Sequence, residues 1–451
     1  MLILRAGMAL MALMPPLPAG AVQAQGAPAV EAASAPTGNI SSTRDTVVSD
    51  SARRLYERSR TQLLQIRTLL KTQDSQASVG SGFVVSEAGH VITNYHVVSQ
   101  YALEPDRYRL RYASTEGASG ELELLDFDVR RDLALLRVKG YRADAALKFR
   151  PQQQALSKGD RLYSMGNPHD VAFAVVEGNY NGLVDRSMDP LIYYSGAINA
   201  GMSGGPVVDE EGRVTGVNVS AMILAQQMSF LVPATYAESL LARSRDAQPI
   251  TRPAWGRVSE QLLRYQDELV TRFLAQPWRM VSQQRYQLPV PQEEFMRCWG
   301  RGTGADAKGL QFQRSQCRME HALFVSGEMQ TGYLDMAHEV YDGAKLGALR
   351  FSRQYAASFR NEALGQADRH RTAPFCRENF VQRDGLPLRA VACMRAYRKL
   401  GGLYDLTVLV TTVDASTQGA LGRFDAKGVS FDNALKLTSH YLEGFAWSKP
   451  Q

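Results

Sequence analysis

The chain has 451 residues, of which 45% are hydrophobic and 21% charged, a balance typical of soluble globular proteins with two or three domains. The formal net charge of +6 is small for this length and the basic residues form no long run, so nucleic acid is excluded as an expected partner. Beyond the N-terminal segment, no stretch is long and apolar enough to predict a transmembrane helix.

Residues 1–24 predict a secretory signal peptide. Arg5 supplies a positive start, and the apolar run that follows is interrupted by Pro15 and Pro16, so it is short for a bilayer span. Small residues before the expected cut predict cleavage after Ala24. The alternative is an N-terminal anchor that stays in the membrane. The pattern favours Sec-type export from a bacterial cytoplasm into the periplasm or beyond, with no stable membrane span after signal removal.

The composition then changes along the chain and predicts its domains. Residues 25–50 are rich in Ala, Pro, Gly and Ser and predict a disordered linker. We expect a first folded domain over residues 51–245, a second linker over 246–257 and a second folded domain over 258–451.

The first folded domain is rich in strand-like runs of apolar and β-branched residues. Glu87-Ala88-Gly89 separates two of these runs and predicts a hairpin. The runs are residues 63–70, 78–86, 89–98, 108–112, 121–127 and 133–138.

Two residues with side chains suited to acid–base chemistry stand at ends of these runs. His96 follows the buried part of the run 89–98, where a lone histidine is more often a satisfied core residue. Asp132 opens the apolar run 133–138, where a lone aspartate is more often an edge cap. Each residue taken alone therefore favours the structural interpretation.

Ser203 lies in the segment Gly201-Met-Ser-Gly-Gly-Pro206, whose glycines allow a sharp backbone turn. Such a turn aims the amides of Gly201 and Ser203 at one point beside the hydroxyl. Two fixed donors there would stabilise a tetrahedral oxyanion by roughly 3–4 kcal/mol each. An ordinary glycine-rich turn before a strand is the alternative.

A serine hydroxyl is a poor nucleophile without a base, and the base needs an orienting acid. The order His96, Asp132, Ser203 supplies all three, with gaps of 36 and 71 residues that suit two barrels meeting at a cleft. We therefore predict a catalytic triad of these residues, with an oxyanion hole formed by the amides of Gly201 and Ser203.

Residues 62–242, two fifths of the chain, resemble the trypsin-like serine proteases of the HtrA/Deg group. Several ordered motifs at family-like spacing carry this resemblance. They are Gly80-Ser-Gly82, Thr93-Asn-x-His-Val-Val98, Asp132-Leu-Ala-Leu-Leu136, Gly159-Asp160, Gly166-Asn-Pro168, Glu177-Gly178, Ala197-Ile-Asn-Ala-Gly-x-Ser-Gly-Gly-Pro206, Gly212-x-Val-x-Gly-Val-Asn218 and Phe230-x-Val-Pro233.

The resemblance implies a mostly β protease domain of two antiparallel six-stranded barrels, chymotrypsin-like, followed by a helix at residues 233–243. It implies a serine endopeptidase that cleaves unfolded or extended envelope polypeptides and needs no metal or organic cofactor. Members of the group are usually trimers, so the resemblance leaves a homo-oligomeric state as an open alternative to a monomer. Two departures favour an alternative, a catalytically silent binding or chaperone module: Met202 replaces a usual Asn, and no PDZ-like carboxylate-binding loop follows residue 250.

The resemblance also suggests which residues form the specificity pocket. Ala197 would sit at its base, with Val217, Val219, Met228 and Phe230 in its walls. No acidic residue is placed to receive Lys or Arg, so we predict an aliphatic residue before the scissile bond.

The sequence of the second folded domain predicts an α+β fold with an antiparallel sheet. Residues 259–274 carry a helical apolar stripe, and Ser430 is a candidate cap for a last helix over 431–445. No catalytic constellation is present, so substrate capture, partner binding or restraint of the protease are the expected roles. Strand-like runs occur at 279–288, 310–316, 320–328, 346–353, 380–383, 388–397 and 403–413.

All four cysteines lie in this second domain, at Cys298, Cys317, Cys376 and Cys393. An even number in an exported chain predicts two disulfides, for which three pairings exist and the pairing of sequence neighbours is the simplest. A zinc site is the competing interpretation, but the cysteines lack the short C-x2-C spacing of such sites.

Overall fold

The computed structural model describes residues 49–140, 144–184, 186–221, 228–304, 306–359 and 364–448. The predicted signal peptide and nearly all of the first predicted linker lie outside these residues. Among the helices in the described part of the chain, none combines the length and the apolar character that crossing a membrane requires.

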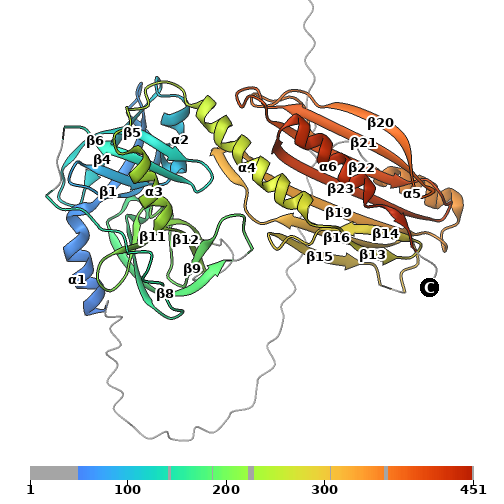
Figure 1. The fold of residues 1–451 in the computed structure, drawn as a ribbon, viewed down its shortest axis with the longest axis horizontal. Helices are drawn as coiled ribbons and strands as arrows, with labels where there is room; N and C mark the ends of the chain where they lie inside the picture. Colours follow the sequence, from blue (N-terminus) through green and yellow to red (C-terminus); the bar gives the residue numbers. More distant parts are fainter. Residues whose placement is uncertain are drawn as a thin grey trace, which may run out of the picture. The chain divides into compact units, whose positions relative to one another are not determined.

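Two closed six-stranded barrels make up the N-terminal half, and every strand pair in them is antiparallel (Figure 1). The predicted pair of barrels is therefore confirmed. The first barrel runs in the order β1 (Leu63–Leu70), β2 (Ser75–Val84), β3 (His90–Thr93), β6 (Leu133–Val138), β5 (Ser119–Asp128) and β4 (Tyr108–Ser114). The second runs in the order β10 (Pro206–Val208), β11 (Val214–Ala221), β12 (Ser229–Pro233), β9 (Leu191–Tyr194), β8 (Ala174–Val184) and β7 (Arg161–Gly166).

Short helices frame the barrels. α1 (Asp50–Ser59) is joined to β1 by the single turn η1 (Arg60–Gln62), and the single turn η2 (Pro168–Asp170) links β7 to β8. α3 (Ala234–Ser244) begins directly after Pro233, as predicted, and packs against β5 and β6 of the first barrel and β11 and β12 of the second. This helix therefore holds the two barrels together.

Helix α2 (Tyr95–Leu103) was not predicted. The strand in the run 89–98 was expected to end in Thr93-Asn-Tyr-His96, but β3 ends at Thr93 and α2 follows. The first-turn amides of α2 are satisfied from a distant segment: Tyr95 N–H donates to the Asp132 carbonyl at 3.2 Å and His96 N–H donates to the Asp132 carboxylate at 2.8 Å. This tertiary cap overrides the strand preference of the β-branched pair that follows His96.

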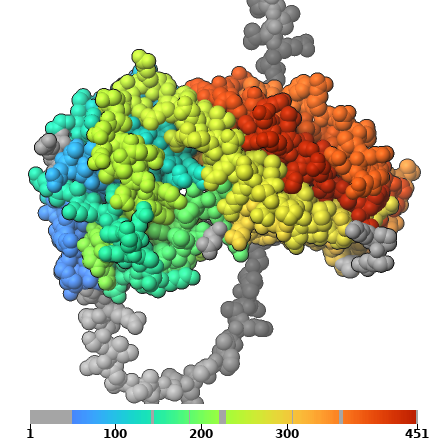
Figure 2. Space-filling model, in the orientation of Figure 1, coloured from blue at the N-terminus to red at the C-terminus, as the bar shows by residue number. Residues whose placement is uncertain are grey.

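The C-terminal region is built on a seven-stranded antiparallel sheet, so the predicted antiparallel α+β architecture is confirmed. α4 (Trp255–Ala275) and α6 (Phe431–Glu443) lie side by side and pack on β22 and β23 (Figures 1 and 2). Ser430 caps α6 as predicted, since its Oγ accepts from Asn433 N. The sheet order is β15 (Met296–Gly302), β16 (Gln311–Met319), β19 (Tyr333–Asp342), β23 (Gln418–Val429), β22 (Tyr404–Thr412), β21 (Leu386–Ala396) and β20 (Phe375–Arg383).

Smaller elements complete this region. β13 (Arg279–Gln283), β14 (Tyr286–Val290) and β24 (Ala446–Trp447) form a three-stranded sheet, and β17 (Leu323–Ser326) pairs with β18 (Met329–Thr331) as a hairpin. The predicted strand 346–353 is wrong, because α5 (Ala348–Ser358) begins after Gly347 and buries Phe351. The predicted helix 259–274 is present, but α4 begins at Trp255, within the segment expected to be a linker.

Both disulfides join directly opposed residues of neighbouring strands. Cys298 of β15 bonds Cys317 of β16, and Cys376 of β20 bonds Cys393 of β21. This is the pairing of sequence neighbours. β15 and β20 are the two edge strands of the sheet, so each disulfide fastens an edge strand, the element most prone to fraying and mispairing, to its neighbour.

Candidate active site

His96 and Asp132 are brought together by the pairing of two short strands. β3 pairs with β6 so that Thr93 lies opposite Ala134, which puts the residue after one strand beside the residue before the other. Asp132 adopts a left-handed backbone conformation with φ of 53°. Its carboxylate meets His96 twice: Oδ2 lies 2.6 Å from the ring Nδ1, and Oδ1 accepts from the backbone N–H at 2.8 Å.

This double contact fixes the ring and changes its acidity. Burial alone lowers the pKa of His96, but the charge of Asp132 and its hydrogen bond act in the opposite direction and raise that pKa above 6.5. The two side chains stay 28% and 18% exposed, so the histidine is accessible to a reactant. A carboxylate at Nδ1 leaves Nε2 as the nitrogen that can take a proton.

The Ser203 turn is pressed against the first barrel. Ser81 N–H of β2 donates to the Ser203 carbonyl at 2.8 Å. A Cβ on Gly204 would lie 2.3 Å from the Thr93 Oγ1, so only glycine permits this approach to the strand that leads to His96. Among the described residues, however, no hydrogen bond joins Ser203 Oγ to His96 Nε2.

The backbone of the turn is held in one orientation. The Ala200 carbonyl accepts from His169 N–H at 2.7 Å, and the Gly201 carbonyl accepts from Ser81 Oγ at 2.7 Å. Because a peptide's N–H points opposite to its carbonyl, the first bond directs the Gly201 N–H away from His169. Within the described part of the chain, the amides of Gly201 and Ser203 have no hydrogen-bond partner, as donors reserved for a ligand would require.

Met202 does not face the site. Its side chain is completely buried in the core of the second barrel, with Ile192, Ile198 and Leu231 among its neighbours. The residue that departs from the HtrA/Deg pattern therefore contributes packing, and the turn around it is shaped by backbone bonds such as Met202 N–H to Asn199 O at 3.0 Å.

The predicted pocket residues have different surroundings. Ala197 is exposed, and Val219, Met228 and Phe230 are half-buried. Val217 is completely buried in the core beneath α3, where no substrate side chain reaches it.

The sequence comparisons fit this geometry. The family model described as the trypsin-like peptidase domain matches residues 80–217. Serine protease HTRA3 of Homo sapiens is 33% identical over 180 residues, which are 38% of this chain and 39% of the relative. Serine protease HTRA1 of Xenopus laevis is 29% identical over 196 residues, 42% of this chain and 40% of the relative. Residues 80–217 are thus similar to the trypsin-like peptidase domain, and the relatives named here are serine proteases of the HtrA group.

The chain spans about two fifths of the length of these curated relatives. A crystal structure of the serine endoprotease from Yersinia pestis has 22% identity and a TM-score of 0.38, and the match covers 44% of this chain and 69% of that chain.

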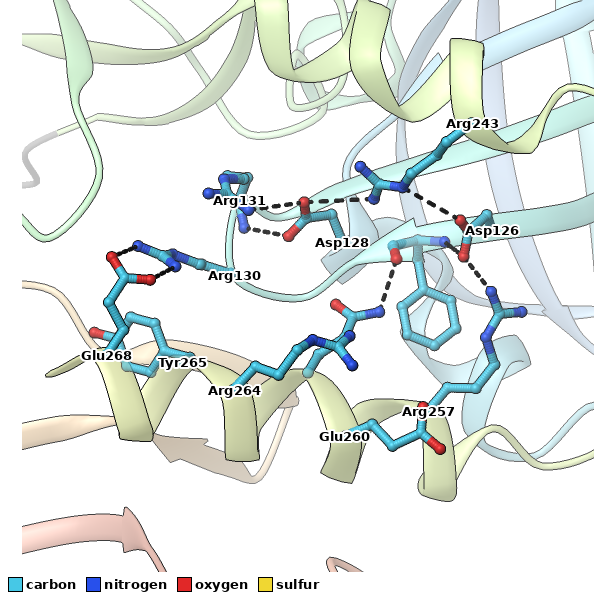
Figure 3. Close-up of a pocket in the computed structure, with 12 residues that line it drawn as sticks. Asp126, Asp128, Arg130, Arg131, Arg243, Arg257, Glu260, Arg264, Tyr265 and Glu268 are labelled. Carbon is cyan, nitrogen blue, oxygen red and sulfur yellow. Dashed lines mark hydrogen bonds and ion pairs between the residues drawn. The ribbon is translucent and has the colours of Figure 1, made fainter. Parts of the chain in front are cut away.

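A charged cavity of about 460 Å³ lies between the segment that precedes Asp132 and α4 (Figure 3). Arg130 and Arg131 directly precede Asp132. Arg130 forms an ion pair with Glu268 of α4, and Arg131 pairs with Asp128 of β5. Each arginine is thus paired with a carboxylate. The Arg130–Glu268 pair links the segment before Asp132 to α4, the first helix of the C-terminal region. The described residues hold no group of three or more His, Cys, Asp and Glu side chains that could bind a metal.

Sequence reasoning missed the contribution of the C-terminal region to this site. The Phe324 ring of β17 meets the His96 ring edge to face, with centroids 5.9 Å apart. Tyr95 Oη, one residue from His96, donates to the Val325 carbonyl at 3.1 Å. No local pattern could have signalled contacts between residues 230 positions apart in the chain.

Proposed function

We propose that this protein is an exported serine endopeptidase that hydrolyses peptide bonds through an acyl-enzyme on Ser203. Two observations support the proposal. A carboxylate bonds His96 twice, and the Ser203 turn, which carries two unpartnered amides, packs against the strands of the first barrel that lead to that histidine. These are the base, orienting acid, nucleophile and oxyanion donors that acyl transfer needs.

In this mechanism Ser203 Oγ attacks the scissile carbonyl, and His96 Nε2 takes the hydroxyl proton. The negative charge that develops on the carbonyl oxygen is stabilised by the amides of Gly201 and Ser203, at roughly 3–4 kcal/mol each. His96 then gives its proton to the leaving amine, while Asp132 stabilises the imidazolium. Water, activated by the same histidine, attacks the acyl-enzyme and releases the second product.

The substrates proposed are unfolded or extended polypeptides of the cell envelope, because an extended segment can add to a strand beside the cleft. We propose an aliphatic residue before the scissile bond. Val219, Met228 and Phe230 support this preference because they are apolar and half-buried. Peptides cut after Val or Ala should be preferred over peptides cut after Arg, and clear cleavage after Arg would refute the pocket assignment.

Export is proposed from the sequence of residues 1–24 together with the two disulfides, which persist in oxidising compartments. Mass spectrometry of the mature N-terminus in the periplasmic fraction of a bacterial host tests both parts. A protein that starts at Gln25 is expected, and a cytoplasmic protein with Met1 intact would contradict the proposal.

A silent binding module on the same scaffold is the second candidate. The observation in its favour is that no hydrogen bond joins Ser203 Oγ to His96 Nε2 in the described part of the chain. Catalytic hydrogen bonds are often long in a free enzyme and tighten when substrate binds, so this observation does not decide the matter.

Hydrolysis of fluorescein-labelled unfolded casein by the wild type and by Ser203→Ala separates the two candidates. The endopeptidase proposal predicts peptide release by the wild type and none by the variant at equal folding. A folded wild type that binds casein without cleaving it would instead support the binding module.

A further inference from the structure

Residues 319–324, which run from the end of β16 into β17, meet the peptidase domain at two points. Phe324 packs edge to face on His96, with an interplanar angle of 71°. Three residues earlier, His321 packs edge to face on Phe230, with centroids 6.1 Å apart and an angle of 83°. His96 is the proposed base and Phe230 a proposed pocket wall, so these residues contact the proposed site at two points.

This segment is firmly held. The next residue, Val325, is completely buried in a core shared with Val97 and Val98 of α2 and with α4. The hydrogen bond from Tyr95 Oη to the Val325 carbonyl is itself buried. On the paired strand β18, Thr331 Oγ1 lies 2.8 Å from the hydroxyl of Tyr397 in the main body of the C-terminal region.

The segment encloses a cavity of about 200 Å³ against the peptidase domain. Asp132 and Val219 line it from the peptidase side, so it is continuous with the proposed site. Apolar side chains form much of its remaining surface, namely those of Met188, Leu191, Tyr236, Phe295, Leu323 and Phe324.

The charged residues around this cavity pair with one another. Asp189 accepts from Arg130 Nε at 2.6 Å and from Arg131 at 3.3 Å, and Glu320 accepts from Arg297 at 2.8 Å. Arg186 is exposed to solvent. An occupant therefore meets a largely apolar interior whose charges are already compensated.

We propose that residues 319–324 form the outer wall of a substrate subsite, and that this subsite takes a large apolar side chain upstream of the scissile bond. The proposal rests on the endopeptidase function proposed above. Because this wall contacts both His96 and Phe230, a substrate residue bound between those two side chains would lie beside the cavity. Pockets that hold whole ligands measure roughly 300–1,000 Å³, so this smaller cavity fits a single side chain.

The C-terminal region is thus a specificity determinant of the peptidase. The test compares full-length wild type, Phe324→Ala and the matched control Phe380→Ala, whose phenyl ring on β20 is 71% exposed. A small fluorophosphonate, which has no upstream side chain, first counts the assembled sites in each protein. A peptide library varied at the positions before the cut then measures side-chain selectivity.

The expected result for Phe324→Ala is a fall of at least tenfold in the kcat/KM preference for Leu over Ala at one upstream position, since a single apolar contact in a pocket discriminates by about 10–200-fold. Phe380→Ala should keep the wild-type profile. Phe324→Leu, which keeps an apolar side chain, should lie between, and it replaces the alanine variant if that variant does not fold.

Two outcomes would overturn the proposal. One is an unchanged profile in variants that are labelled as fully as the wild type. The other is an equal gain for every peptide, which would make the segment a lid without selectivity. Failure of the wild type to react with the fluorophosphonate would instead refute the endopeptidase function and this inference with it.

Discussion

Replacement of Asp132 by Asn probes the orientation of the proposed base while preserving side-chain shape. In the wild type, one carboxylate oxygen faces His96 Nδ1 at 2.6 Å and the other accepts from the His96 backbone N–H at 2.8 Å. The amide oxygen of Asn can keep the second bond. Its NH2 group then faces Nδ1, which must become an acceptor, so the ring proton moves to Nε2 and the base is lost.

The wrong tautomer in a serine-protease triad costs about 10⁴-fold in kcat. This corresponds to about 5 kcal/mol of transition-state stabilisation. The substitution also removes both causes that raise the pKa of His96 and leaves only the burial that lowers it. Because the base works when neutral, wild-type activity should rise with pH through a pKa above 6.5, and the residual activity of the variant should rise at a lower pH.

The assay is kcat/KM for an internally quenched peptide from pH 5 to 9, with folding checked by circular dichroism. Asp128→Asn is the matched control, because it removes a nearby carboxylate that pairs with Arg131 and does not contact His96. The control should keep activity within about tenfold of the wild type. Activity of Asp132→Asn within tenfold of wild type, with an unshifted pH profile, would refute the proposed role of Asp132.

Three further predictions concern stability. Gly204→Ala should lower the free energy of unfolding by about 2 kcal/mol or more, because φ is +84° and a Cβ would lie 2.3 Å from a backbone oxygen; wild-type-like urea denaturation would contradict this. Burial lowers the pKa of His338 to about 3. Below pH 6.5 this residue therefore binds a proton in the unfolded chain but stays neutral in the folded chain. Stability should therefore fall by about 2 kcal/mol between pH 7 and 5 from this residue, and His338→Gln, compared by urea denaturation, should lack that part of the slope. The disulfides close loops with sequence separations of 19 and 17 residues, and loss of either one should lower the free energy of unfolding by about 3 kcal/mol. An unchanged melting temperature in a variant with both cysteines of one pair replaced by serine would contradict this prediction.

Several strands of the barrels could be predicted because their information is local, whereas the closure of these strands into two barrels was implied only by the resemblance to the HtrA/Deg group. The strand-like run 63–70 predicted both ends of β1, and the glycines around Ser203 predicted a sharp turn before β10. α2 could not be predicted in this way. Val97 and Val98 favour a strand, and only the distant Asp132 supplies the groups that start the helix.

The same distinction explains what was missed at the site. Val217 and Val219 look alike in sequence, but the first is completely buried and the second lines a cavity. The register of β11, which shifts between Asn218 and Ser220, is set by its partner strand rather than by its own residues. Likewise, Phe324 reaches His96 only because the C-terminal hairpin packs on α2, a contact that depends on the whole fold.

The central claim is that Ser203 is an activated nucleophile beside a formed oxyanion hole. The most direct measurement is fluorophosphonate labelling of the full mature chain, with the modified residue located by peptide mass spectrometry and Ser203→Ala as control. We predict one label per chain, on Ser203, that is absent from the variant. A folded wild type that stays unlabelled, with or without added unfolded substrate, would contradict this claim. Equal labelling of the wild type and the Ser203→Ala variant would also contradict it.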